Sequence, residues 1–181
     1  NELFDDSEYA SAFEETSTKD WYEFWASDDF NIDDYEADLD KLRAWFLEKG
    51  LLDAEILGDT VIFNDTEEEV VIRVRVKEGP QVFVRNVTFE GNTVYKDDEL
   101  IRRLDVNKGE IYNGTKISQN LTVNETQTDA ASLYNDNGYL SASLQPELTR
   151  ISDDTVDINV RVFEGDRFSI RKVSITGNTK T

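Results

Sequence analysis

Carboxylates are the reactive side chains that this sequence offers in quantity. It contains 39 Asp and Glu but no His, Cys or Met, so a general base would have to be a carboxylate, Lys or Tyr. Two carboxylates held at a set separation in a cleft can hydrolyse a glycosidic bond. Here the acids fall in expected loops, helix caps and solvent-facing strand positions. We therefore expect no catalytic residue and no enzyme, and keep an acidic carboxylate-dependent hydrolase as an alternative.

The run Asn135-Asp136-Asn137-Gly138 is the one stretch that hints at a metal loop. An EF-hand register would put Leu133 at the first ligand position and would offer no Glu at the twelfth. The run is better explained as the end of a helix. Without His or Cys a transition-metal site is not expected. We predict no metal and no cofactor.

Acid dominates the charge of the chain. The formal net charge is −20, and residues 1–40 hold 15 acids against the single base Lys19. Such a chain repels nucleic-acid phosphate and anionic lipid, so neither is expected as a direct partner. The acidity is consistent with life in high salt, where screening weakens repulsion, or with an acidic N-terminal face that docks a basic partner. Both interpretations stay open.

A 24-residue stretch occurs twice and organises the rest of the chain. Residues 70–93 recur as residues 156–179 with 12 identical positions, which indicates a unit laid down in tandem. Each copy is a strand, a glycine turn, a second strand and a Gly-Asn-Thr exit. No apolar run reaches the ~20 residues of a membrane span. The chain opens on Asn1 and lacks a signal peptide, so we expect a piece of a longer protein.

The elements between the copies follow from hydrophobic periodicity. Tyr35, Leu39, Leu42 and Phe46 form one stripe of a helix over 33–49, and a shorter helix is predicted over 5–16. Strands are predicted at 53–63, 70–77, 82–90, 140–151 and 156–162, with a short helix from Asp97 and a long helix over 115–137. The unit is β-α-α-β-β. We therefore predict an α+β fold in which a three-stranded mixed sheet packs under two helices.

The strand at 140–151 carries the main candidate site. Pro146 cannot donate to a sheet ladder, which indicates an edge strand, and an exposed edge can bind an extended peptide through backbone hydrogen bonds. An edge blunted by Pro146 and Glu147 is the competing interpretation. The candidate peptide-binding residues are Ser141, Ser143, Leu144, Gln145, Glu147 and Thr149.

Two further sets of residues have distinctive sequence signatures. Trp21, Phe24 and Trp25 lie in an acidic segment and are either a packing cluster or an exposed anchor for a partner, since Trp is enriched at binding hot spots. Turns that need unusual backbone angles are expected at six positions. These structural turn positions are Gly50, Gly79, Gly91, Asn92, Gly138 and Gly165.

The ordered set of these motifs resembles the POTRA domain. The resemblance rests on Gly91-Asn92, on Gly138-Tyr139-Leu140 at the end of the second helix and on the Glu164-Gly165 end of the last strand, with a second copy at Gly50 and Glu78-Gly79. It implies a first POTRA domain lacking its first strand over 1–79, a complete domain over 80–165 and the first strand of a third over 166–181.

Tandem POTRA repeats of this kind are similar to the periplasmic arm of BamA-type proteins, and the acidic, Trp-rich segment 19–30 is similar to Bacteroidota versions. The resemblance implies a periplasmic arm that binds unfolded outer-membrane β-barrel precursors by strand addition and docks accessory subunits. It also implies a C-terminal β-barrel in the full-length protein. The alternative within the same fold is the arm of a two-partner-secretion or TamA-like transporter.

Overall fold

The structure, a computed structural model, describes residues 3–12, 25–26, 32–63 and 70–174. The chain divides into two compact units. Unit 1 comprises Asn1–Arg85, Asn107–Lys116 and Arg150–Asp157, and unit 2 comprises Asn86–Val106, Ile117–Thr149 and Ile158–Thr181. The domain boundaries at residues 79 and 165 derive from the repeat, and they stay a prediction.

The first sheet has the strand order β1–β3–β2 and lies in unit 1. The predicted hairpin is present as β2 (Glu55–Phe63) and β3 (Val70–Lys77), which pair antiparallel. The two-residue strand β1 (Trp25–Ala26) pairs with the start of β3. Sequence periodicity gave no sign of β1, because two residues are too few to show alternation.

Helix α2 (Ile32–Glu48) contributes Tyr35, Leu42 and Phe46 to the core of the first sheet, and α1 (Asp6–Ala10) adds a short turn near it. The predicted stripe is confirmed, since Tyr35, Leu42 and Phe46 are buried and Leu39 packs against them. Burying one such side chain stabilises the fold by roughly 1.5–3 kcal/mol. Predicted to reach residue 16, α1 ends at Ala10, and Ser11 then hydrogen-bonds back to Ser7.

The second sheet has the order β4–β6–β5, with β4 at Phe83–Glu90, β5 at Ser143–Ser152 and β6 at Thr155–Phe163. Arg85 bonds Asp157 and Thr88 bonds Asn159, so β4 and β6 run parallel. A turn at 153–154 joins β5 to β6 and makes that pair antiparallel. The sheet is therefore mixed, as predicted.

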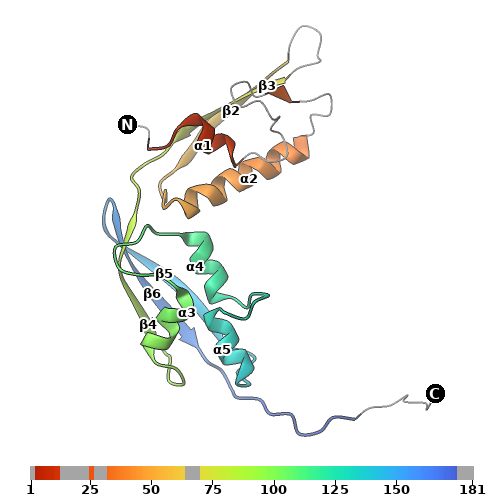
Figure 1. Cartoon of the computed structure of the whole chain (residues 1–181), viewed down its shortest axis with the longest axis vertical. Coiled ribbons are helices and arrows are strands. Elements are labelled where there is room, and N and C mark those ends of the chain that lie inside the picture. The colour runs from red at the N-terminus through yellow and green to blue at the C-terminus, as the bar shows by residue number, and fades with distance from the viewer. Residues whose placement is uncertain (1–2, 13–24, 27–31, 64–69, 175–181) are drawn as a thin grey trace, which may run out of the picture. The chain divides into compact units, whose positions relative to one another are not determined.

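Three helices lie on one side of this sheet (Figure 1): α3 (Asp97–Leu104), α4 (Gly114–Leu121) and α5 (Ala130–Asp136). The side chains that bury the core of unit 2 come from both layers. They are Val87, Phe89, Ile158, Val160 and Val162 from the strands and Leu100, Leu104, Ile117, Leu121, Ala130 and Tyr134 from the helices.

The long helix predicted over 115–137 is wrong, because the chain leaves the helix after Leu121 and re-enters it at Ala130. Asp129, which is fully buried, caps the new start by accepting hydrogen bonds from the Ser132 amide (2.7 Å) and hydroxyl (2.8 Å). The same carboxylate accepts the Asn124 amide at 2.9 Å. Thr, Asn and Asp compete for backbone groups and favour such interruptions.

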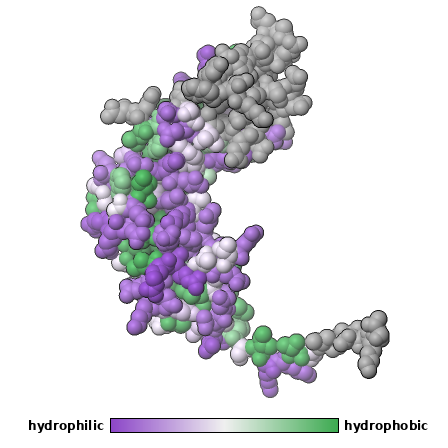
Figure 2. All heavy atoms as spheres, viewed as in Figure 1, coloured by the Kyte–Doolittle hydropathy of each residue, from purple (hydrophilic) through white to green (hydrophobic). Residues whose placement is uncertain are grey.

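Residues 164–174 lie outside any helix or strand. Their assignment to the first strand of a further domain stays a prediction. The apolar side chains Phe168, Ile170 and Val173 of this segment are exposed, and green apolar surface gathers there in Figure 2, beside a face that is mostly hydrophilic. An exposed apolar segment of this kind is suited to packing against further protein.

Candidate functional site

β5 lies at one edge of the second sheet. Its strand neighbour is β6, and among the described residues no strand pairs with its other side. Backbone N–H and C=O groups along that side are therefore open to a partner strand. This is the arrangement that peptide addition to a sheet requires.

The side chains of β5 are exposed along almost the whole strand. Leu144 is buried at 7% exposure, whereas all residues from Gln145 to Ser152 are exposed. Leu148 of β5 and Leu140, which precedes the strand, are 42% and 65% exposed, so neither shares the burial of Leu144. The helices thus cover only the start of β5.

Contacts differ among the candidate residues of this strand. The Glu147 carboxylate pairs with Arg161 of β6 at 2.9 Å, so it points toward the neighbouring strand rather than toward the open edge. Gln145 donates to the Ser143 hydroxyl at 3.4 Å on the same face. Thr149 is exposed. Edge charge such as that of Glu147 discourages unselective pairing, but the backbone edge stays open.

Ser141 precedes β5, and its hydroxyl lies against Gly165. A side-chain carbon at Gly165 would collide with the Ser141 Oγ, so the bare backbone of Gly165 makes room for this serine. Ser141 thus contacts the Glu164-Gly165 end of β6, which distinguishes it from the other candidates.

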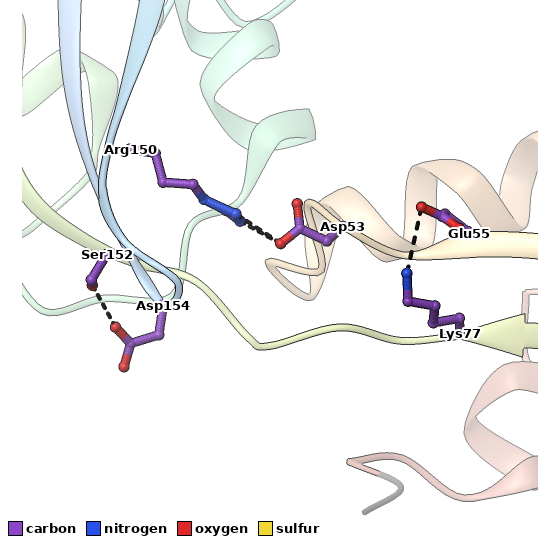
Figure 3. Close-up of polar contacts among 6 residues, drawn as sticks. All are labelled: Asp53, Glu55, Lys77, Arg150, Ser152 and Asp154. Atoms are coloured by element: carbon purple, nitrogen blue, oxygen red, sulfur yellow. Dashed lines mark hydrogen bonds and ion pairs between the residues drawn. The ribbon is translucent and has the colours of Figure 1, made fainter.

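The end of β5 belongs to unit 1 rather than unit 2. Arg150 donates through both terminal nitrogens to Asp53 Oδ2, at 2.7 and 2.6 Å, and Ser152 donates to Asp154 at 2.7 Å (Figure 3). The stretch 143–149 is the part of β5 within unit 2. It contains all the candidate peptide-binding residues except Ser141, which precedes β5.

Glu164 does more than end a strand at a turn, which is all that its sequence motif predicts. Its carboxylate accepts hydrogen bonds from the Thr93 amide (2.7 Å) and the Val94 amide (2.8 Å), from the Thr93 hydroxyl and from the Tyr134 hydroxyl (3.2 Å). Partial burial raises the pKa of Glu164, but these hydrogen bonds outweigh it and hold the pKa below its usual range.

Glu78 does the same at the equivalent position of the first copy. It accepts from the amides of Leu3 (2.8 Å) and Phe4 (3.4 Å) and from the Tyr9 hydroxyl. In each copy the glutamate therefore fixes the loop that lies about 70 residues earlier. The presence of this glutamate in both copies of the repeat indicates that it matters. A sequence repeat does not show, however, which groups the glutamate binds.

The predicted turn glycines all have positive φ: Gly50 74°, Gly79 73°, Gly91 91°, Gly138 89° and Gly165 68°. At Gly91 a side-chain carbon would also collide with the Val162 carbonyl, and at Gly138 with that of Phe168. These two positions need glycine for space as well as for conformation. Asn92 donates from its side chain to the Tyr95 carbonyl (3.0 Å) and to Asp97 (2.8 Å), which leads the chain into α3.

The predicted docking aromatics Trp21 and Phe24 lie outside the described residues, and only the backbone of Trp25 is described. That backbone pairs with Val71. A separate aromatic cluster is formed by Phe4, Tyr9, Trp45 and Phe46, with ring centroids 5.0–6.4 Å apart. The Lys49 ammonium lies 5.4 Å from the Trp45 ring.

No group of three or more His, Cys, Asp or Glu in the described ranges could hold a metal ion. Within the same ranges no helix is both long and apolar enough to cross a membrane.

Residues 82–165 match the POTRA family, described as a surface antigen variable number repeat. This range holds β4, α3, α4, α5, β5 and β6, which is the predicted β-α-α-β-β unit with its second helix broken in two. These residues form a POTRA domain.

Two outer membrane protein assembly factors are similar to this chain in sequence. The chain is 29% identical over 149 residues to the outer membrane protein assembly factor BamA of Neisseria meningitidis, covering 76% of this chain and 18% of that protein. It is 26% identical over 152 residues to BamA of Nitratidesulfovibrio vulgaris, covering 81% and 18%. The chain is thus similar in sequence to a segment of BamA proteins. It spans about a fifth of the length of these relatives.

Solved structures agree on the fold. A crystal structure of Haemophilus influenzae BamA POTRA domains 3–5 matches 100% of this chain and 69% of its own, with a TM-score of 0.62 and 23% identity. BamA of Haemophilus ducreyi lacking POTRA domains 1–3 matches 74% of this chain and 23% of its own, with a TM-score of 0.53 and 21% identity.

Proposed function

We propose that this chain is a non-enzymatic periplasmic arm of a BamA-type assembly protein, and that β5 binds unfolded outer-membrane β-barrel precursors by strand addition. Accessory subunits would dock on the same arm, and a C-terminal barrel would complete the full-length protein. The observation that carries the proposal is the open outer edge of β5 in a domain of the POTRA family.

Physical chemistry supports this partner. Strand addition gains its affinity from backbone hydrogen bonds, so it tolerates many sequences. Barrel precursors share alternating polar and apolar strands of about 10 residues, which matches the length of β5, Ser143–Ser152. The exposed apolar residues Leu148 (42%) and Ile151 (43%) lie on opposite faces of β5, and each can contact the side chains of such a strand on its own face.

Photocrosslinking in the full-length protein tests the site. A photoreactive residue would be placed at Gln145 or Thr149 on the edge strand, and at Asn159 on the central strand β6 as the matched control. Precursor peptides are expected to label the two edge positions and to leave Asn159 unlabelled. Labelling confined to the helices would contradict strand addition.

Proline scanning tests the backbone. Successive amides of a strand point to opposite sides, so of Leu148→Pro and Thr149→Pro one removes an outward N–H and the other breaks the ladder to β6. We expect one variant to stay folded but lose peptide labelling, and the other to lose stability. Undiminished labelling in every folded proline variant would mean that the outer edge is not used.

A further inference from the structure

The solvent-facing side of the first sheet carries two arginines that have no acidic partner among the residues that the structure describes. Arg73 and Arg75 are exposed on β3 and face Thr60 and Gly58 of β2 across the ladder. Among the described residues neither arginine has an ion pair or a side-chain hydrogen bond. In a chain of net charge −20, two such guanidinium groups on one face are unexpected.

The equivalent face of the second sheet is neutralised within the sheet. The repeat aligns Arg75 with Arg161, and Arg161 pairs with Glu147 at 2.9 Å. Asp157 on the same strand is paired with Arg85. The same position in the fold is therefore paired in the second copy, whereas in the first copy the described residues provide no partner for it.

A bulge in β2 shapes the surface beside the arginines. Ile56 pairs with Val76 but Gly58 pairs with Arg75, so β2 contains one extra residue, Leu57. Arg75 Nη2 would lie 3.3 Å from a side-chain carbon at Gly58, so the guanidinium lies over bare backbone. Leu57 is 57% exposed and Ile62 is 40% exposed on the same strand.

We propose that this arginine face, defined as Arg73, Arg75, Thr60, Gly58, Leu57 and Ile62, binds an acidic extended segment of a partner protein. Alternate residues of a strand are about 6.6 Å apart along its axis, so carboxylates at every second residue of an extended segment match the two guanidinium groups. Leu57 and Ile62 provide apolar contact for the side chains between them.

The net charge of the chain argues against two other partners for this face, a second copy of the chain and an anionic bilayer. A second copy of this chain also carries −20, and an anionic bilayer is likewise repelled by the whole molecule. A short acidic segment brings little total charge and can approach the arginines alone. Lys77, the next basic residue on this face, already pairs with Glu55 at 3.7 Å (Figure 3), so Arg73 and Arg75 are the unpaired bases among the described residues of this face.

Fluorescence anisotropy with a labelled decapeptide of alternating Glu and Val tests the proposal, using the 181-residue chain. The double variant Arg73→Gln/Arg75→Gln should weaken binding about tenfold, as expected for two exposed charge pairs. The matched control is Arg102→Gln/Arg171→Gln, which removes the same charge from exposed arginines elsewhere and should change affinity less than twofold. A peptide with five Val followed by five Glu should bind more weakly than the alternating one.

Thr60→Asp provides a second variant that keeps both arginines. It places a carboxylate opposite Arg73 and so copies the internal pairing of the second sheet. Peptide affinity should fall while circular dichroism stays unchanged. Equal peptide binding by the arginine variant and its control would overturn the proposal. So would arginine-dependent binding of phosphatidylglycerol vesicles or arginine-dependent self-association in place of peptide binding.

Discussion

Glu164 connects three separate segments of its domain through hydrogen bonds to one carboxylate. Its carboxylate accepts from the backbone and hydroxyl of Thr93, from the Val94 amide and from Tyr134, which is itself fully buried. Burial and the neighbouring Glu164 raise the pKa of Tyr134, so it stays a hydrogen-bond donor at any ordinary pH. Charge-assisted bonds of this kind are roughly twice as strong as neutral ones.

Replacing Glu164 by Gln should therefore destabilise the chain by about 2 kcal/mol at neutral pH. The folded-state pKa of Glu164 lies below its ordinary value of 4.5, so its contribution is present above about pH 4.5 and is lost as the pH falls through the folded-state pKa. Urea unfolding of both proteins from pH 7 to pH 3 should show a stability difference that shrinks on acidification.

Glu125→Gln is the control for this experiment, because Glu125 is exposed. Its stability should match that of the parent chain within about 0.5 kcal/mol at every pH. If Glu164→Gln also matched the parent at pH 7, Glu164 would not be holding the loop at Thr93.

Among the elements, the break between α4 and α5 depends on a buried helix cap. Asp129 is the N-cap of α5 and also binds the Asn124 amide, whereas Asp5, the N-cap of α1, is exposed. Removing Asp129 leaves buried donors without an acceptor, which costs more than losing an exposed cap.

Asp129→Ala should therefore cost about 2–4 kcal/mol, and Asp5→Ala should cost clearly less, because Asp5 is exposed. Thermal unfolding measures both, and hydrogen exchange of the Ser132 amide reports on the cap directly. Comparable losses from the two variants would show that burial of Asp129 adds nothing to its capping role.

Periodicity predicted the elements that bury a regular face. Helix α2 and strand β3 agree with their predicted ranges to within one residue. Periodicity did not predict the interruption between α4 and α5, because a single side chain, Asp129, caps the new helix start. It also does not show how far the helices bury a strand, as the exposure of Leu148 in β5 illustrates. The edge position of β5 was predictable from Pro146, but Arg150 with Asp53 and Glu164 with Thr93 join residues far apart in sequence, and no local pattern reports such pairs.

The whole molecule carries far more acid than its ion pairs use. The described pairs engage bases such as Lys77, Arg85 and Arg161, and the sum over the chain remains −20. Uncompensated charge repels itself and opposes compaction, and added salt screens it over about 10 Å at 0.1 M.

The unfolding midpoint in urea should rise between about 0.02 and 0.5 M NaCl because of this screening. Sodium chloride suits the test better than sulfate, which strengthens apolar burial by exclusion from the surface. A strong rise would favour the high-salt interpretation of the acidity. A flat profile would contradict it and favour an acidic docking face.

The anchoring of early loops by late glutamates also constrains how the chain folds. Glu164 bonds a residue 71 positions earlier and Glu78 one 75 positions earlier, so each loop is fixed only when the last strand of its repeat is available. During synthesis from the N-terminus at roughly 5–20 residues per second, the glutamate that binds each loop is made several seconds after the loop itself. Contacts of such long sequence separation slow folding, and a ribosome-bound or partly exported chain would leave the most recent repeat unfinished.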